Sequence, residues 1–185
     1  MVAKFFGKLA LITGAAQGVG KETVKLFAKN QANVCMDDIN YKELKKAEIE
    51  INQGDSKVIS IKTDISYYDY IKKMACPAIK EFGNIDFLIN SATKNIVKPV
   101  MDLEWNEWDN PLNVNLKGTF FYLVSVAHGM IKNNISRSIV NITSFAGKGG
   151  RPMFLSYAAI KAAVIKYKSV CVFGIHTTIS RNLGI

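Results

Sequence analysis

The stretch TGAAQGVG at residues 13–20 decides the fold of this chain. It follows a short apolar run at residues 9–13 and precedes residues 19–30, whose apolar side chains have helical spacing. Glycine permits a tight turn and a close approach of the backbone to a pyrophosphate, which the N-terminus of the following helix stabilises. Many glycine-rich turns are merely turns. This one has the strand-turn-helix context that dinucleotide binding requires.

An acidic residue is expected about 20 residues after such a turn, where it binds the adenosine ribose at the end of the second strand. Asp37 and Asp38 occupy that place. We prefer Asp38 as the ribose ligand because it ends the apolar run, and Asp37 is the alternative. If neither binds a ribose, the two residues are simply acids in a solvent-exposed loop. The extra phosphate of NADP would be repelled here, and the turn holds no basic residue, so NAD is favoured over NADP. Lys21, just after Gly20, softens this preference.

Strand-like and helix-like segments alternate along the whole chain. The expected strands are residues 9–13, 33–37, 58–62, 85–90 and 138–142. The expected helices are residues 19–30, 41–52, 66–82 and 111–133, and one that begins near Phe154. This alternation predicts an α/β fold, a doubly wound, Rossmann-like parallel sheet with helices on both faces. We expect residues 1–185 to form a single domain.

The composition is that of an ordinary globular protein, with 49% hydrophobic and 21% charged residues. No apolar run approaches the roughly 20 residues that span a bilayer, so we expect no membrane partner. The net charge of +9 suggests nucleic acid, but lysines alternate with acids, as at residues 42–48, and solvated helix faces explain them. We expect no nucleic-acid partner. Three widely spaced cysteines (Cys35, Cys76 and Cys171) predict no metal site, no disulfide and a cytoplasmic location.

Further landmarks follow the turn in order. They are Asp64–Ile65, NSAT at residues 90–93, NVNLKG at residues 113–118, SIVNITSFAG at residues 138–147 and YAAIK at residues 157–161. Together with the pattern TGxxxGxG, they resemble the landmarks of the short-chain dehydrogenase/reductase family over roughly residues 5–166. Five landmarks in order at suitable spacing are much more specific than Tyr-x-x-x-Lys alone.

The resemblance implies a cofactor site. Its positions in this chain are Thr13, Gly14, Gln17, Gly18, Val19, Gly20, Asp38, Asp64, Ile65, Asn90, Ser91, Ala92, Tyr157 and Lys161. Asp64 and Ile65 match the acidic and apolar pair that contacts adenine in the family. Ser91 and Thr93 stand where the family has Asn and Gly, and the β-branched Thr93 predicts a lower affinity for the cofactor.

The residue types at the end of the resemblance indicate proton chemistry. Tyr157 and Lys161 share one face of a helix because they are four residues apart. A free tyrosine has a pKa of about 10, and a nearby ammonium lowers it, so Tyr157 can act as acid and base. Ser144, at the end of the fifth strand, can hydrogen-bond the substrate oxygen. The resemblance further implies that Lys161 binds the nicotinamide ribose and that Asn115 holds a proton-relaying water.

The resemblance fades after Lys166. Residues 180–185 fit the end of the tyrosine-bearing helix but come several residues late. Family members continue into a sixth strand, a substrate-covering segment and a seventh strand. We expect all of these C-terminal strands to be missing, the domain to be incomplete after about residue 166, and the fifth strand to be an exposed sheet edge. Such a chain should bind NAD better than it catalyses and should tend to aggregate.

The sequence predicts an NAD-dependent oxidoreductase that interconverts a secondary alcohol and a ketone, with Tyr157 as acid/base. Residues 147–152 most resemble family members that act on polyols, acetoin-like diketones or oxoacyl thioesters. The alternative is a non-catalytic, truncated nucleotide-binding or interaction protein. Because family members usually pair through helices, the resemblance implies a homodimer or homotetramer.

Overall fold

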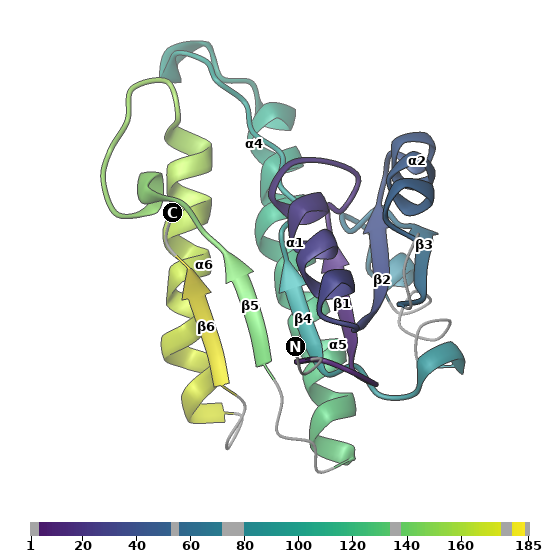
Figure 1. Cartoon of the computed structure of the whole chain (residues 1–185). Helices are drawn as coiled ribbons and strands as arrows, with labels where there is room; N and C mark the ends of the chain where they lie inside the picture. The colour runs from purple at the N-terminus through teal and green to yellow at the C-terminus, as the bar shows by residue number, and fades with distance from the viewer. Residues whose placement is uncertain (1–3, 53–55, 72–79, 134–137, 175–178, 184–185) are drawn as a thin grey trace.

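The fold is built on one parallel sheet. The computed structural model describes residues 4–52, 56–71, 80–133, 138–174 and 179–183. Within these ranges the strands are β1 (Leu9–Thr13), β2 (Asn33–Asp38), β3 (Val58–Lys62), β4 (Phe87–Asn90), β5 (Ser138–Ile142) and β6 (Ile179–Leu183). They follow the order β3-β2-β1-β4-β5-β6, and every neighbouring pair is parallel (Figure 1).

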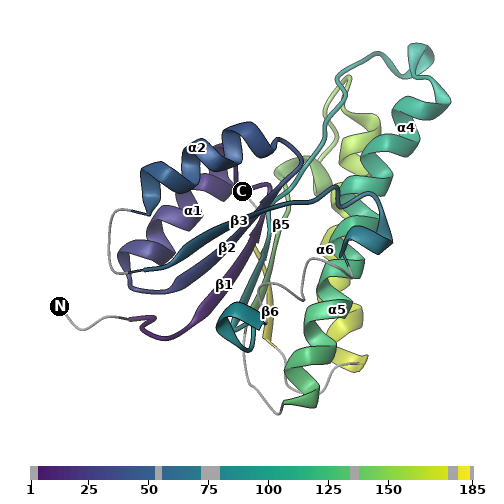
Figure 2. The same cartoon turned by 90° about the vertical axis from the view of Figure 1, so that its right-hand side faces the viewer.

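Helices cover both faces of the sheet (Figure 2). One face carries α1 (Gly18–Lys29) and α2 (Tyr41–Ile51), and the other carries α4 (Trp105–Pro111), α5 (Thr119–Lys132) and α6 (Leu155–Gly174). The predicted doubly wound α/β fold is therefore confirmed. Part of the helix expected at residues 66–82 lies outside the described residues. Its described ends, residues 68–71 and 80–82, are helical.

The sequence of β1 is an uninterrupted apolar run because this strand lies in the core of the fold. All five residues of β1 are buried because helices cover both faces of the sheet. Alternate side chains of a strand point to opposite faces. Ala10 and Ile12 accordingly belong to the cluster that includes Val24 of α1, whereas Leu9 and Leu11 belong to the cluster that includes the residues of α5.

The sixth strand corrects an expectation drawn from the sequence. β6 pairs with β5 in parallel register from Ser138 with Ile179 to Ile142 with Leu183, so β5 is not a sheet edge (Figure 1). The expected absence of this strand was wrong, and so was the suggestion that residues 180–185 end the tyrosine-bearing helix. The sequence ISRNL is short and polar, and it becomes a strand through the backbone of β5 rather than through a pattern of its own.

The strand order reverses beside β1, and this point positions the functional site. β1 pairs with β2 on one side and with β4 on the other. The crossovers from these two neighbours run to opposite sides, so a crevice opens beyond the carboxyl ends of the strands. The glycine turn after β1 and the loop after β4 meet there.

Candidate active site

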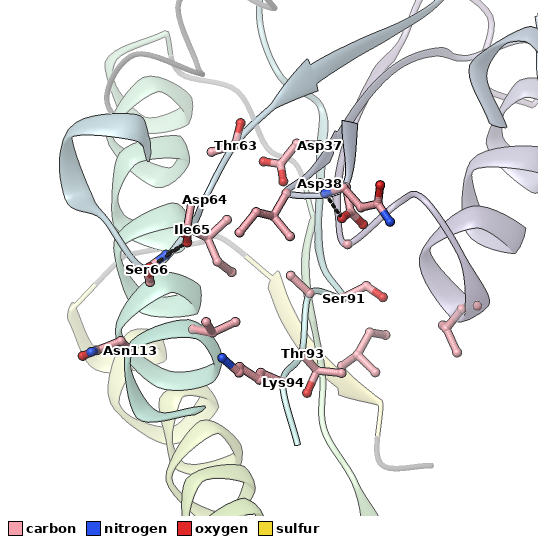
Figure 3. A pocket seen from close by; sticks show the side chains of 18 of the residues that line it. Asp37, Asp38, Thr63, Asp64, Ile65, Ser66, Ser91, Thr93, Lys94 and Asn113 are labelled. Carbon is pink, nitrogen blue, oxygen red and sulfur yellow. Dashed lines mark hydrogen bonds between the residues drawn. The ribbon is translucent and has the colours of Figure 1, made fainter. Parts of the chain in front are cut away.

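A cleft of about 900 Å³ lies at the carboxyl ends of the strands (Figure 3). Twelve of the sequence-predicted site residues line it: Gly14, Gln17, Gly18, Val19, Asp38, Asp64, Ile65, Ser91, Ala92, Ser144, Tyr157 and Lys161. The other four, Thr13, Gly20, Asn90 and Asn115, do not line the cleft. Instead, each of them makes close contacts or hydrogen bonds that hold the surrounding segments in place.

Glycine is required at different positions of the turn for different structural reasons. A Cβ on Gly14, which has φ +64°, would lie 2.6 Å from the Cα of Ala92, so glycine allows the turn to touch the loop after β4. A Cβ on Gly20 would lie 2.2 Å from the carbonyl oxygen of Gly14, so glycine lets α1 pack on the turn. Gly18 has φ +57°, and apart from its own helix and chain neighbours no atom of the described residues lies within 4 Å of its Cβ position. The turn is thus packed on two sides and open toward the cleft.

Thr13 ties the end of β1 to the loop after β4. Its hydroxyl accepts hydrogen bonds from the backbone N–H groups of Ser91 and Ala92, each at 3.0 Å. Asn90 donates from its side-chain nitrogen to Asn141 on β5 at 2.8 Å. Side-chain hydrogen bonds therefore connect β1 with the loop after β4, and β4 with β5, near the carboxyl ends of these strands.

Thr93 is accommodated without backbone strain. Among the described residues, only Gln31 and Met153 are non-glycine residues with positive φ. Thr93 therefore does not occupy the backbone conformation that would require the family's glycine. Its exposed side chain lies on the wall of the cleft (Figure 3). The lower cofactor affinity expected from this residue stays a prediction.

The two consecutive acids at the end of β2 have different surroundings. Asp38 accepts the N–H of Ala16 at 3.1 Å and the N–H of Asn40 at 2.9 Å, so its carboxylate lies beside the glycine turn. Asp37 is 1% exposed and accepts a hydrogen bond from the hydroxyl of Tyr122 on α5. Burial raises the pKa of Asp37 well above its ordinary value. Asp38 remains our candidate for a ribose ligand.

Another wall of the cleft is formed by the segment after β3, which includes Asp64, Ile65 and Ser66. One oxygen of its carboxylate accepts the N–H of Ser66 at 2.9 Å and the hydroxyl of Ser66 at 2.6 Å (Figure 3). Ile65 is buried, and its carbonyl oxygen would lie 2.7 Å from a Cβ on Gly118. The absence of a side chain at Gly118 lets this wall pack closely on the helix that follows α4.

Asn115 lies in a wide helical turn that the sequence did not indicate. We expected one helix over residues 111–133; the chain instead forms α4, a π-helix at Leu112–Gly118, and α5. The side chain of Asn115 donates to the carbonyl oxygen of Lys94 and accepts the N–H of Lys94, both at 2.7 Å. Single π turns are frequent at functional sites. This two-way bond fixes the loop after β4 to the helix.

Ser144, Tyr157 and Lys161 share one wall of the cleft. Lys161 is 4% exposed, donates to the carbonyl oxygen of Ile142 at 2.8 Å, and places its Nζ 5.6 Å from the ring centroid of Tyr157. Burial lowers the pKa of Lys161 to about 8. The Oγ of Ser144 accepts the N–H of Ala146 at 3.2 Å, which leaves its own hydrogen available for another acceptor.

Several residues of the cleft were not predicted. They include Thr63, Lys94, Asn110, Asn113, Val114 and Thr143. Thr63 and Thr143 each follow the last residue of a strand, and Asn113 and Val114 precede Asn115. Because the carboxyl ends of parallel strands meet at one edge, position alone was the signal that could have identified them.

In the described part of the chain, no group of three or more His, Cys, Asp or Glu residues could hold a metal ion. No helix among these residues is long and apolar enough to cross a membrane. Cys35 is buried with a free thiol. Cys76 and the side chain of Cys171 lie outside the described residues.

Comparison with known proteins identifies similar sequences. The family described as short chain dehydrogenase matches residues 8–178. A 3-oxoacyl-acyl-carrier-protein reductase FabG from Thermotoga maritima is 38% identical over 159 residues, which are 86% of this chain and 64% of the relative. A sorbitol dehydrogenase from Cereibacter sphaeroides is 31% identical over 159 residues, 86% of this chain and 61% of the relative. The chain thus spans less than two thirds of the length of both relatives.

Solved structures give the same picture. A short chain dehydrogenase/reductase from Burkholderia phymatum in complex with NAD has a TM-score of 0.94 and 25% identity, covering 98% of this chain and 66% of that one. An NAD+-bound xylitol dehydrogenase has a TM-score of 0.91 and 28% identity, covering 98% of this chain and 71% of that one. The fold described above is therefore similar to the folds of two proteins whose structures contain NAD.

Proposed function

The chain belongs to the short-chain dehydrogenase family, and from this premise we propose that it is an NAD-dependent oxidoreductase that interconverts a secondary alcohol and a ketone. One observation carries the proposal. Ser144, Tyr157 and Lys161 line the same cleft as the glycine turn and Asp38. A substrate bound beside Tyr157 would therefore share the cleft with a dinucleotide bound at the turn.

The cleft suits NAD in shape and charge. Its volume of about 900 Å³ is in the range of small-molecule and cofactor sites, and Gly18 leaves open space where a pyrophosphate would approach the backbone. Each oxygen of Asp38 accepts one N–H group, so each retains a lone pair for a ribose hydroxyl. The phosphate of NADP would meet this carboxylate and be repelled.

The proposed NAD ligands keep the positions assigned from the sequence. Asp64 and Ile65 would contact the adenine, Asp38 the adenosine ribose, the turn at residues 14–20 the pyrophosphate, and Lys161 the nicotinamide ribose. Thr13 and Asn90 would act by holding the surrounding loops. When bound, the nicotinamide supplies a hydride acceptor for oxidation or a hydride donor for reduction.

The chain's own groups would move the proton. The ammonium of Lys161 lies 5.6 Å from the ring centroid of Tyr157. With a pKa of about 8, Lys161 is mostly charged at neutral pH. Tyr157 then takes the hydroxyl proton of an alcohol, or returns it to a ketone oxygen in reduction. The hydroxyl of Ser144 donates to the substrate oxygen, and Asn115 is proposed to hold a water that relays the proton.

A binding assay and a turnover assay together test this function. NADH fluorescence measures cofactor binding, and NADH absorbance measures turnover on a panel of secondary alcohols and ketones. We expect Tyr157→Phe to bind NADH nearly as well as the unchanged chain and to lose turnover, because the phenyl ring keeps the packing without the proton. Full activity in Tyr157→Phe would disprove the assignment of the acid/base.

A non-catalytic nucleotide-binding or interaction protein remains the second candidate. It is favoured by Ser91 and Thr93, which replace the family's Asn and Gly in the loop beside the cofactor position. This candidate predicts NADH binding without turnover on any substrate of the panel. The expected aggregation through β5 loses its basis because β6 covers that strand. A cytoplasmic location and a homodimer or homotetramer stay predictions.

A further inference from the structure

The charges of the chain are divided unevenly along the sequence. Residues 1–109 contain 15 basic residues and all 15 acidic residues, whereas residues 110–185 contain nine basic residues and no acidic residue. The second part supplies α5, β5 and α6, and with them Ser144, Tyr157 and Lys161. The first part supplies the glycine turn and Asp38. The net charge of +9 therefore lies entirely on the part of the chain that carries the proposed reactive groups.

Basic side chains gather around the loops next to that wall. Lys94 lines the cleft (Figure 3), and Lys148 and Arg151 lie in the loop between Ser144 and α6. Lys98 forms an ion pair with Glu107 at 2.8 Å. In the described part of the chain, the ion pairs include neither Lys94, Lys148 nor Arg151. Among the described residues, no carboxylate lies within ion-pair distance of these three cations.

Arg151 lies outside the residues that line the cleft, and two ring contacts connect it with the proposed acid/base. Its Cζ lies 4.6 Å from the ring centroid of Phe154. The ring of Phe154 in turn meets the ring of Tyr157 edge-on, with the centroids 6.3 Å apart. A guanidinium that stacks through its face keeps its N–H groups at the edge for hydrogen bonding. Arg151 can therefore present a fork of donors to a ligand that touches Tyr157.

The backbone between these residues is in an uncommon conformation. Met153 has φ +65°, and its carbonyl oxygen accepts the N–H of Lys98 at 3.0 Å. A non-glycine residue in the left-handed region carries strain and persists only where its surroundings hold it, often at ligand-binding segments. The loop that carries Arg151 is therefore fixed by the hydrogen bond from Lys98 and by the contact between Arg151 and Phe154.

We propose that the substrate is an anionic ketone, or the corresponding alcohol, whose carboxylate or phosphate group binds Arg151. The reacting oxygen then lies between Ser144 and Tyr157, and the anionic group extends past the ring of Phe154 to reach the guanidinium of Arg151. Guanidinium donors match the two oxygens of such groups. Lys94 and Lys148 add positive charge that attracts an anion and disfavours a cation. This inference rests on the proposed function and specifies its substrate class.

Matched ligand pairs test the inference. The first pair is 3-oxobutanoate and its methyl ester, and the second is dihydroxyacetone phosphate and dihydroxyacetone. Affinity for the NADH complex is measured by NADH fluorescence, and kcat/KM by NADH absorbance. We expect the anion of at least one pair to bind about tenfold more tightly than its neutral partner, as a charge-assisted hydrogen bond provides. The pair that shows the effect identifies the anionic group.

Two variants of equal charge separate a local contact from the general positive field. Arg151 is exposed, so Arg151→Gln should fold, and it should lower the ratio of anion to neutral affinity about tenfold. Arg151→Lys should retain part of the ratio. Lys132→Gln removes the same charge from an exposed position in the last turn of α5, shortly before β5 begins, whereas the cleft lies at the carboxyl ends of the strands. This control should leave the ratio unchanged.

The outcomes distinguish this inference from the proposed function. Equal affinity within both pairs, or an equal effect of Arg151→Gln and Lys132→Gln, would overturn the anionic substrate class. Absence of turnover with every ligand would count against the proposed catalysis, while the fluorescence ratios would still decide the selectivity. If NADH fails to bind, the proposed function fails. Thermal shifts of the chain with each acid and its neutral partner then make the same comparison.

Discussion

The hydroxyl of Tyr122 on α5 donates a hydrogen bond to the carboxylate of Asp37 on β2, across 85 residues of sequence. Both side chains are 1% exposed. The other oxygen of Asp37 is buried without a hydrogen-bond partner among the described residues. Burial raises the pKa values of both groups above their ordinary values. The sheet and α5 are thus joined by a carboxyl group that burial disfavours in its charged form.

The first prediction concerns pH and stability at this pair. Because the pKa of Asp37 is raised on folding, the folded chain keeps a proton that the unfolded chain loses above about pH 4. The free energy of unfolding should therefore fall as pH rises from that value toward the folded pKa. Asp37→Asn keeps an acceptor for Tyr122 and removes the titration. We expect it to be roughly 1–3 kcal/mol more stable at neutral pH, with a smaller difference near pH 4.

Urea unfolding over this pH range measures the effect. Asp69→Asn, at an exposed position, is the matched control and should leave the pH slope unchanged. Parallel pH slopes for Asp37→Asn and the unchanged chain would show that Asp37 does not titrate as inferred.

A second prediction is that Lys161 lowers stability while it serves catalysis. Its pKa falls from 10.5 to about 8 on folding, so the unfolded chain binds more protons between these values. Stability should accordingly rise with pH in this window, and the cost of burying the ammonium is fully present below it. Lys161→Met should raise the free energy of unfolding by about 1–3 kcal/mol at neutral pH and abolish turnover.

Thermal unfolding and NADH turnover check this trade-off, with the exposed Lys166→Met as the control. The gain in stability should shrink as the pH approaches 10.5, where the lysine of the unfolded chain also loses its proton. A Lys161→Met variant that is less stable at neutral pH would contradict the expected desolvation cost.

The third prediction concerns cofactor choice. Asp38 lies beside the glycine turn through its bond to Ala16, whereas Asp37 points to α5. Asp38→Ser should therefore shift the ratio of NAD to NADP affinity toward NADP by about tenfold, because it removes the charge that repels the extra phosphate. Asp37→Asn removes the neighbouring acid and should leave the ratio unchanged. Fluorescence titrations with NADH and NADPH decide between the two acids, and an equal shift in both variants would disprove the assignment.

The fourth prediction separates packing from ligand contact in the glycine turn. In Gly14→Ala the new Cβ would lie 2.6 Å from the Cα of Ala92, so we expect a loss of about 3 kcal/mol or more in folding stability. In Gly18→Ala the new Cβ meets no described residue within 4 Å beyond its own helix and chain neighbours, and the cost is that of a positive φ, about 1–2 kcal/mol. Gly18→Ala should still weaken NADH binding because its methyl group projects into open space beside the turn. Unchanged NADH affinity would mean that the pyrophosphate does not approach Gly18.

The sequence by itself determined the first five strands and the glycine turn at the cleft. β1 and β3 begin and end where the apolar runs predicted, at Leu9–Thr13 and Val58–Lys62. Strands covered on both faces need continuous apolar runs, so their local pattern is sufficient to find them. The glycine turn and the spacing of Tyr157 and Lys161 are also local, because a turn and one helical turn involve only neighbouring residues.

Only the tertiary structure decided the features that depend on distant partners. β6 forms because the backbone of β5 offers unpaired hydrogen-bonding groups. Asn115 lies in the π-helix, and both polar atoms of its side chain form hydrogen bonds with the backbone of Lys94, 21 residues earlier. The different surroundings of Asp37 and Asp38 depend on Tyr122 and on the turn, respectively. Hydrogen bonds between residues far apart in sequence leave no periodic pattern, so these features become visible only when the chain is folded.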